Sequence, residues 1–315
     1  MSTDQPSSDP HPTVQDVVAA ADALWPFRLQ EDWDASGLVL GRPEAPVRRI
    51  HLAVDPVAAV VREAVDEGAD LLLTHHPLLL RGVTSVAADG FKGRVVHDLV
   101  ENHCALLCCH TSADSARRGV SDALIAACGV GPDDAAPLVP HSSDPRTGLG
   151  RVGTLDEPVT LRELAERLAR RIPPTVQGLR VAGDQDRRVS TVAVCGGSGD
   201  SLFDVVRSHG ADVYVTADLR HHPASEARER ALGPGEHGTP ALVDAAHSAS
   251  EALWLPWAAA DLQRALTARG FAVEIHVSTL RTTRGISRWP PRRSETPRAG
   301  WPPEASGLPP RTSHP

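Results

Sequence analysis

The feature that most constrains the fold is a strand-helix-strand pattern that occurs twice. The copies read "VRRIHLAVDPVAAVVREAVDEGADLLLTHHP" from residue 47 and "RVSTVAVCGGSGDSLFDVVRSHGADVYVTADLRHHP" from residue 188. In each, an apolar run precedes a helix of about ten residues, a glycine ends the helix, and a second apolar run follows at 69–74 or 211–216. Gly68 to Thr74 match Gly210 to Thr216 at an offset of 142 residues, and each copy then reaches a His-His-Pro. We predict an α/β fold with two related α/β domains from an internal duplication, their sheets flanked by helices.

The rest of the chain can be divided around these copies. We expect a disordered N-terminus at 1–12, a first half at 13–135, a second half at 136–280 and a disordered tail at 281–315 that is rich in Pro and Arg. The Gly/Pro/Asp-rich stretch 129–150 is the expected connection. Leu161, Leu164, Leu168 and Ile172 are spaced as on a helix, and Thr160 with Glu163 indicates a capped start.

Composition and charge exclude several classes of protein. With 41% hydrophobic and 23% charged residues, the 315-residue chain is typical of a globular protein. The net charge is −8, but residues 281–315 carry seven Arg and two Glu, which leaves −13 for residues 1–280 and makes nucleic acid an unlikely partner. We find neither a secretory signal nor an apolar run of about 18 to 20 residues, so we expect a cytoplasmic protein without a membrane partner. The five cysteines form no C-x-x-C pair, which predicts buried, reduced thiols.

Metal-ligand residues follow three of the predicted strands or lie on the helix beyond. His75 and His76 end the run "LLLTHH", where Pro77 stops a regular strand, so that both rings can point into one cleft and serve one ion or two. Taken alone, a histidine at a strand end is more often an ordinary hydrogen-bonded loop residue than a metal ligand. His110 and Asp114 follow the next apolar run.

Two further observations complete this set. Asp114 could bridge two cations with its two oxygens, or it could cap a helix that begins near residue 115. His247 and Glu251 are four residues apart, which places both on one face of a helix. Three such pairs, each beside a predicted strand end, favour a metal site over three separate coincidences.

The sequence resembles the Nif-three-like dinuclear metal-centre family, whose members are also labelled GTP cyclohydrolase I type 2 homologues. The resemblance covers residues 13 to about 280. It rests on "WDASGLVLG" (33–41), "GADLLLTHHPLL" (68–79), "HTSAD" (110–114), "VCGGSGDS" (194–201), "GADVYVTADLRHHPA" (210–224) and "DAAHSASE" (244–251).

The resemblance implies a site, a cofactor and an assembly. It implies that His75, His76, Asp114, His247 and Glu251 hold two divalent ions per chain, which could be zinc, iron, manganese or cobalt, in the cleft between the domains. It also implies a toroidal homohexamer. The family usually has Asn where this chain has Ala35, so any hydrogen bond made by that Asn is lost.

The chemistry expected of such a site is hydrolysis. Two cations about 3.5 to 4 Å apart lower the pKa of a bound water and polarise a substrate oxygen. We therefore expect a metal-dependent hydrolase acting on a small molecule, with a GTP-cyclohydrolase-like reaction on a nucleotide suggested by the family label alone. His110, His221 and His222 are candidate catalytic acids or bases. "CGGSGDS" could hold a phosphate or be a plain glycine turn capped by Asp200. The rival function is a non-enzymatic metal-binding, scaffold or regulatory protein.

Overall fold

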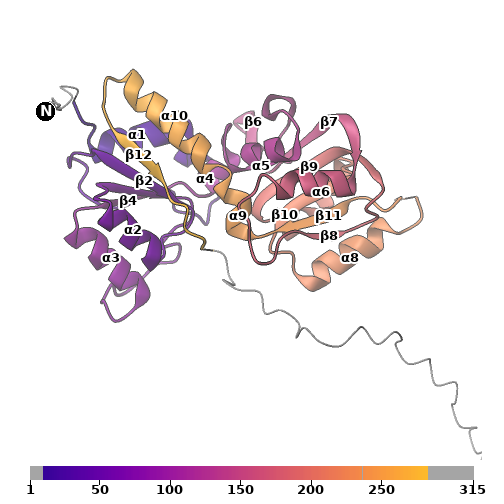
Figure 1. Ribbon diagram of the computed structural model, residues 1–315, viewed down its shortest axis with the longest axis horizontal. Helices are drawn as coiled ribbons and strands as arrows, with labels where there is room; N and C mark the ends of the chain where they lie inside the picture. Colours follow the sequence, from indigo (N-terminus) through magenta and orange to yellow (C-terminus); the bar gives the residue numbers. More distant parts are fainter. Residues whose placement is uncertain (1–9, 236, 283–315) are drawn as a thin grey trace, which may run out of the picture.

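The computed structural model describes residues 10–235 and 237–282, which form two five-stranded sheets, each lying between helices (Figure 1). The first sheet has the order β1-β4-β3-β2-β12. Its strands are β1 (Gly37–Leu40), β2 (Arg49–Ala53), β3 (Leu71–Thr74), β4 (Ala105–Cys108) and β12 (Glu274–Val277). All neighbours are parallel except β1 and β4.

Helices cover both faces of the first sheet. Successive side chains on its central strands point to opposite faces and are apolar on both, so each face must be buried by helices. Leu71 and Leu73 of β3 pack with helices α1 (Val14–Leu24) and α10 (Leu255–Ala268). Leu72 faces the opposite layer, with α2 (Ala58–Asp66) and α3 (Phe91–Glu101). The carboxyl end of β3 is therefore held rigidly from both sides, and that end carries the histidine pair.

The second sheet has the order β7-β9-β10-β11-β8. Its strands are β7 (Arg151–Thr160), β8 (Arg180–Ala182), β9 (Arg188–Ser198), β10 (Val213–Ala217) and β11 (Ala241–Ala245). One apolar layer joins it to α5 (Val120–Cys128) and α6 (Leu161–Ala169), and the other to α7 (Phe203–Ser208) and α8 (His221–Ala231). The predicted capped start of α6 is confirmed: Thr160 accepts from the N–H of Glu163, whose carboxylate accepts from the N–H of Thr160.

Short elements fill the region between the sheets and the surface. The expected connection at 129–150 contains a hairpin rather than only loop, because its two strands pair with each other. The remaining elements are α4 (Thr111–Ser115), α9 (His247–Ala252), β5 (Val139–His141), β6 (Asp144–Leu149) and the 3-10 turns η1 (Phe27–Leu29), η2 (Pro132–Asp134) and η3 (Asp200–Leu202).

The two copies of the sequence repeat share backbone geometry at the same offset of 142 residues. Asp70 accepts hydrogen bonds from the N–H groups of residues 48 and 49, and Asp212 accepts from those of residues 190 and 191. Gly68 and Gly210 end their helices with φ of +67° and +65°, where a residue with a Cβ would be strained. β2-α2-β3 and β9-α7-β10 are thus equivalent units of two parallel strands joined by one helix.

The chain does not divide into two consecutive halves as expected at 136–280. β12 pairs with β2 in the first sheet, and α10 packs on α1 in the same layer. The reason is that Ile275 and Val277 continue the apolar surface of the first core. In the sequence, the residues of the second sheet therefore stand between two segments that both belong to the unit of the first sheet.

Other sequence predictions can be compared with the described residues. All five cysteines are free and buried, as predicted. In the described part of the chain, no helix combines the length and apolarity that membrane spanning requires. The predictions of disorder for 1–12 and 281–315 lie mostly outside the described residues. Of these, residues 10–12 and 281–282 are described, and the N–H of Val47 donates to the carbonyl of Pro12.

Candidate metal centre

The histidine pair lies directly beyond β3, deep in the protein. The N–H groups of His75 and His76 donate to the carbonyls of Ala53 and Val54, which continues the pairing with β2 past the end of the strand. His75 is only 1% exposed. The rings of His75 and His76 lie 5.1 Å apart between centroids, so the break in the strand brings neighbouring side chains into one cluster.

Two more histidines, His110 and His247, join this cluster, and the Nδ1 atom of each of the four has an oxygen partner. These partners are the Cys109 carbonyl for His75 (2.9 Å), Asp55 for His76 (2.6 Å), Asp34 for His110 (2.9 Å) and Asp218 for His247 (2.9 Å). An acceptor at Nδ1 fixes the proton on that nitrogen and leaves the Nε2 lone pair free. The network therefore assigns the tautomer that ligates a metal through Nε2.

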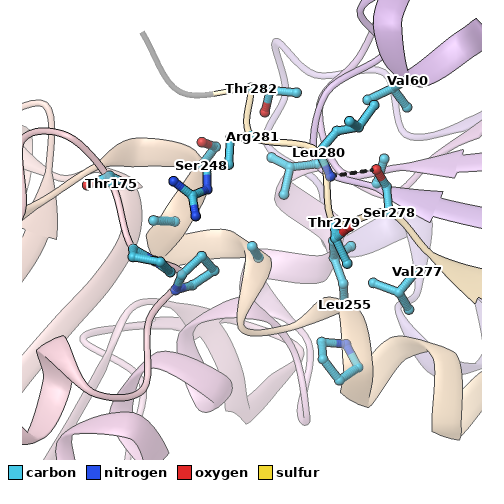
Figure 2. A pocket seen from close by; sticks show the side chains of 17 residues that line it. Val60, Thr175, Ser248, Leu255, Val277, Ser278, Thr279, Leu280, Arg281 and Thr282 are labelled. Atoms are coloured by element: carbon cyan, nitrogen blue, oxygen red, sulfur yellow. Dashed lines mark hydrogen bonds between the residues drawn. The ribbon is translucent and has the colours of Figure 1, made fainter. Parts of the chain in front are cut away.

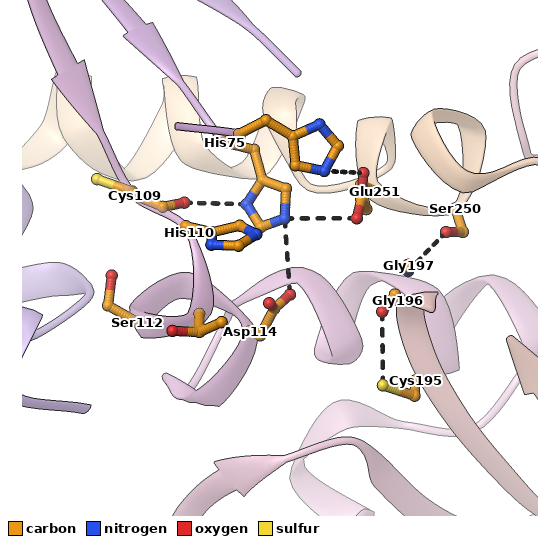
Figure 3. A network of polar contacts seen from close by, with 12 residues as sticks. His75, Cys109, His110, Ser112, Asp114, Cys195, Gly196, Gly197, Ser250 and Glu251 are labelled. Carbon is orange, nitrogen blue, oxygen red and sulfur yellow. Dashed lines mark hydrogen bonds and ion pairs between the residues drawn. The ribbon is translucent and has the colours of Figure 1, made fainter. Parts of the chain in front are cut away.

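Two carboxylates, the buried Glu251 and the partly buried Asp114, face Nε2 atoms of this cluster (Figure 3). Oε1 of Glu251 lies 2.9 Å from Nε2 of His247 and 3.5 Å from Nε2 of His75, and Oε2 of Glu251 lies 3.2 Å from Nε2 of His76. Oδ1 of Asp114 lies 3.8 Å from Nε2 of His75. The α9 helix supplies both His247 and Glu251 from one face, as their spacing predicts.

The ligand-type atoms form two overlapping groups. One consists of His75, His76 and His110, and the other of His76, His247 and Glu251; within each group the ligand atoms lie within 4.8 Å of one another. Because the groups share His76, two ions held in them would be neighbours. Asp114 lies next to the first group and Glu251 contacts members of both.

Three buried atoms indicate that a cation fits here. Among the described residues, Nε2 of His75, Oδ1 of Asp114 and Oε2 of Glu251 have no hydrogen-bond partner. Buried polar atoms without partners cost free energy, and a cation bound between them would satisfy all three. Nε2 of His76 and Nε2 of His247 are only 3.2 Å apart, so with both lone pairs facing inward they also require a proton or a cation between them.

The pKa shifts of the clustered histidines and of Glu251 also indicate that a cation fits at this centre. Burial disfavours the charged form of His76, but Glu251 and Asp55 outweigh it and raise the pKa of His76 to about 10. Burial also opposes the charge on His247, whose pKa Glu251 nevertheless raises to about 9. Burial would raise the pKa of Glu251, yet His76 and His75 hold it well below its ordinary value. The carboxylates thus favour positive charge at the centre, which a divalent cation can supply in place of protons.

The glycine turn at the end of β9 forms one wall of the centre. Gly197 has φ +66°, and a Cβ there would lie 2.5 Å from Oε1 of Glu251 and 3.2 Å from Nε2 of His247. Its N–H donates to Oγ of Ser250, 3.0 Å away. Of the two interpretations of "CGGSGDS", the structure favours the glycine turn. Asp200 pairs with Arg220 and makes no described cap hydrogen bond.

Asp114 is not a helix cap in the structure. This residue lies within α4, and the next helix, α5, starts after Gly119 with no side-chain cap. Burial raises the pKa of the Asp114 carboxyl, which faces His75 instead of a helix terminus.

His221 and His222 are not in the cluster. They are exposed at the first turn of α8, where their rings contact each other at 5.2 Å, and no described hydrogen bond or ion pair links them to the centre. At the constant offset of 142 residues the equivalent of His76 is Asp218, and Asp218 does reach the centre through His247. The second His-His-Pro begins four residues later than that offset requires.

Sequence reasoning missed two residues that orient the ligands, Asp55 and Asp218. Asp218 follows directly after β10, and Asp55 lies two residues beyond the end of β2, the strand next to β3. Asp34 also orients a histidine, because it accepts hydrogen bonds from His110 and from the backbone and hydroxyl of Thr111. Ala35, where a family Asn was expected, is exposed and donates its N–H to Asp34.

A cavity of about 330 Å³ gives access to the centre from solvent. It is lined by Asp55, His76, Gln177, Asp218, His247, Ser248 and Thr282. Two of the clustered histidines therefore border open space, as a site for a small molecule requires.

Comparison with known proteins identifies the family. The family model Duf34/NIF3 (NGG1p interacting factor 3) matches residues 12–284. The chain belongs to the NIF3 family. The Streptomyces coelicolor protein named GTP cyclohydrolase 1 type 2 homolog is 54% identical over 269 residues, covering 85% of this chain and 91% of that protein. A Mycobacterium bovis NIF3 relative of the same name is 33% identical, covering 85% of this chain and 95% of that protein.

Solved NIF3 structures share the fold. A Bacillus cereus protein related to NIF3 superposes with a TM-score of 0.77 at 24% identity, covering 88% of this chain and 99% of that one. A Staphylococcus aureus hypothetical protein superposes with a TM-score of 0.76 at 25% identity, covering 86% and 97%. The predicted family is confirmed, and with it the mixed α/β fold with sheets flanked by helices.

Proposed function

We propose that the protein binds two divalent metal ions per chain and is a metal-dependent hydrolase. The observation that carries this proposal is a cluster of four imidazoles in which an oxygen holds each Nδ1 and the Nε2 atoms of His75, His76 and His247 converge on Glu251. Ligands that are oriented in advance by a second layer of acceptors are the usual construction of a metal site.

The residues divide between the ions as follows. His75 and Asp114 would hold one ion and His247 the other, while His76, which belongs to both groups, could serve either ion through Nε2. The two carboxylates, with two oxygens each, would be the groups able to bridge. Bound at this place, two divalent ions supply a water of lowered pKa and polarise a substrate carbonyl or phosphoryl oxygen. Five side chains leave coordination positions open, which favours catalysis over a purely structural role.

His110 is the histidine we propose as acid or base. Its ring lies 5.3 Å from that of His75 and 5.7 Å from that of His76, and Asp34 holds its Nδ1. It could move a proton at Nε2 next to the reacting atoms, or it could complete the first ligand group. His221 and His222 are too poorly connected to the centre for us to propose a catalytic role for them.

Three wider properties belong to the same proposal. The matching hydrogen bonds at the offset of 142 residues support an internal duplication. The free, buried cysteines favour a reducing compartment, and hence the cytoplasm. The homohexamer rests on the family resemblance, and light scattering tests it: a mass near 33.5 kDa would reject it. Relatives named GTP cyclohydrolase 1 type 2 homolog suggest a nucleotide substrate.

One experiment tests metal binding and hydrolysis together. Protein purified without an affinity tag is reconstituted with zinc, iron, manganese or cobalt, analysed for metal, and screened against nucleotides, amides and phosphate esters with and without chelator. We expect two ions per chain and one chelator-sensitive activity. Fewer than one ion per folded chain would reject the dinuclear centre. Two ions without any activity would favour the rival function, a metal-binding or regulatory protein.

A further inference from the structure

We propose that the centre takes small amphipathic anions, whose apolar ring and anionic group are held in a second cavity beside the metal-side cavity. This inference rests on the proposed function, because it specifies the class of ligand that the same site accepts. The juxtaposition that carries it is an apolar cavity, an unpaired arginine and the opening onto His76 and His247.

The second cavity has a volume of about 340 Å³ and lies next to the metal-side cavity, with which it shares Ser248 and Thr282 (Figure 2). Its wall comes from five places: the end of β2, helix α2, the loop after α6, the α9–α10 region, and the end of β12 with the segment that follows it. The apolar part of the lining includes Val54, Val60, Pro173, Leu255 and Val277. Since about 150 Å³ is enough for a benzene ring, the cavity has room for a substituted ring.

Arg281 supplies a positive charge at this cavity. Within residues 10–235 and 237–282, its side chain has no hydrogen bond or ion pair, and it is the single Arg or Lys in the lining of either cavity. Figure 2 shows it extending toward the side of the cavity where Ser248 and Thr175 lie. Oγ1 of Thr175 is buried and has no hydrogen-bond partner among the same residues. A carboxylate or phosphate bound there would pair with the guanidinium and accept from this hydroxyl.

The charges of the two cavities set the orientation of the ligand. Asp55 and Asp218 border the metal-side cavity, where they disfavour an anionic group that does not ligate a metal. The apolar cavity contains Arg281 and no carboxylate. The ring and its anionic group therefore bind in the apolar cavity. The polar group on which the centre acts then extends toward His76 and His247.

Three matched probes test this arrangement by titration calorimetry on the full-length protein. 3-Acetamidobenzoate has a ring, a carboxylate and an amide; acetanilide lacks the carboxylate; N-acetylglycine lacks the ring. We expect 3-acetamidobenzoate to bind about tenfold more tightly than N-acetylglycine, because burying the ring contributes about that factor. We expect it to bind about fivefold more tightly than acetanilide, because Arg281 is exposed and its charge pair contributes less. The titrations are done with chelator and again with metal, so that retention of the pocket is measured independently of the centre.

Two arginine variants complete the test. Arg281→Gln should reduce the advantage of 3-acetamidobenzoate over acetanilide to less than about threefold, whereas Arg42→Gln, at an exposed arginine that borders neither cavity, should leave it unchanged. Equal affinities for the three probes, or an Arg281→Gln variant that behaves as the parent, would overturn the inference even if the protein holds two metals and hydrolyses a substrate. Conversely, intact discrimination in a protein that binds no metal would reject the proposed function and leave the pocket standing.

Discussion

Gly197 offers the sharpest test of the candidate metal centre, because a single methyl group would collide with two of the residues that we propose as ligands. Gly197→Ala places a Cβ 2.5 Å from Oε1 of Glu251 and 3.2 Å from Nε2 of His247. Ordinary van der Waals contact for a Cβ begins near 3.4 Å, so the carboxylate must retreat by about 1 Å. Metal-ligand distances in proteins tolerate only about 0.2 Å, so a displacement of this size would prevent Glu251 from acting as the ligand that we propose.

The same substitution also strains the backbone, and the effect of this strain must be distinguished from the effect of the collision with Glu251 and His247. Alanine in the left-handed region at φ +66° costs about 1 to 2 kcal/mol. Gly210 has φ +65° with nothing within 4 Å of an added Cβ, which makes Gly210→Ala a control with the strain and without the collision. Both variants should lose several degrees of melting temperature, at roughly 2 to 4 °C per kcal/mol for a protein somewhat smaller than this one.

The assay is competitive metal titration with a chromogenic chelator, followed by elemental analysis of the desalted protein. We expect Gly197→Ala to lose at least one ion and to bind metal about 100-fold or more weakly, and Gly210→Ala to match the parent. If Gly197→Ala remains folded and keeps two ions with parental affinity, then Glu251 and His247 do not hold metal in the way we propose.

The remaining predictions address other parts of the site and the tail. Asp114→Asn removes a charge whose buried Oδ1 has no described hydrogen-bond partner, so without metal the variant should melt no lower than the parent, and after reconstitution it should hold one ion or none; two ions would reject Asp114 as a ligand. Asp218→Ala should weaken metal binding by about 10- to 100-fold and Asp218→Asn by less, because the amide oxygen can still accept from Nδ1 of His247; equal loss in both would contradict an orienting role. Truncation after residue 284, where the family match also ends, should leave melting temperature and metal content unchanged; a clear fall in either would show that the tail contributes to the fold.

Much of the fold was predictable because its signals are local. Apolar runs of four to six residues, helices ended by Gly68 and Gly210, and the capped start at Thr160 are properties of neighbouring residues, and they gave the two strand-helix-strand units. The pairing of β12 with β2 could not be predicted in this way, because it does not depend on neighbouring residues. It joins residues more than two hundred positions apart, and nothing within the four residues of β12 specifies its partner.

The candidate site shows the same division between local and distant information. His75, His76, His247 and Glu251 were found because their residue types and spacing are themselves unusual. Asp55 and Asp218 act only through the ring orientation of a histidine elsewhere in the chain, so single-sequence spacing could not single them out. The repeat offset was the one available signal for Asp218, and the more conspicuous His-His-Pro at 221–223 obscured it.

The place of β12 in the first sheet has a consequence for how the protein is made. Until residues 274–277 leave the ribosome, β2 is the outer strand of that sheet and presents its unpaired N–H and C=O groups to the surroundings. The whole second sheet must emerge during this interval. A nascent or prematurely terminated chain that stops before Glu274 therefore carries an open strand edge beside a largely complete core, which is the kind of surface that seeds association between incomplete chains and that chaperones cover.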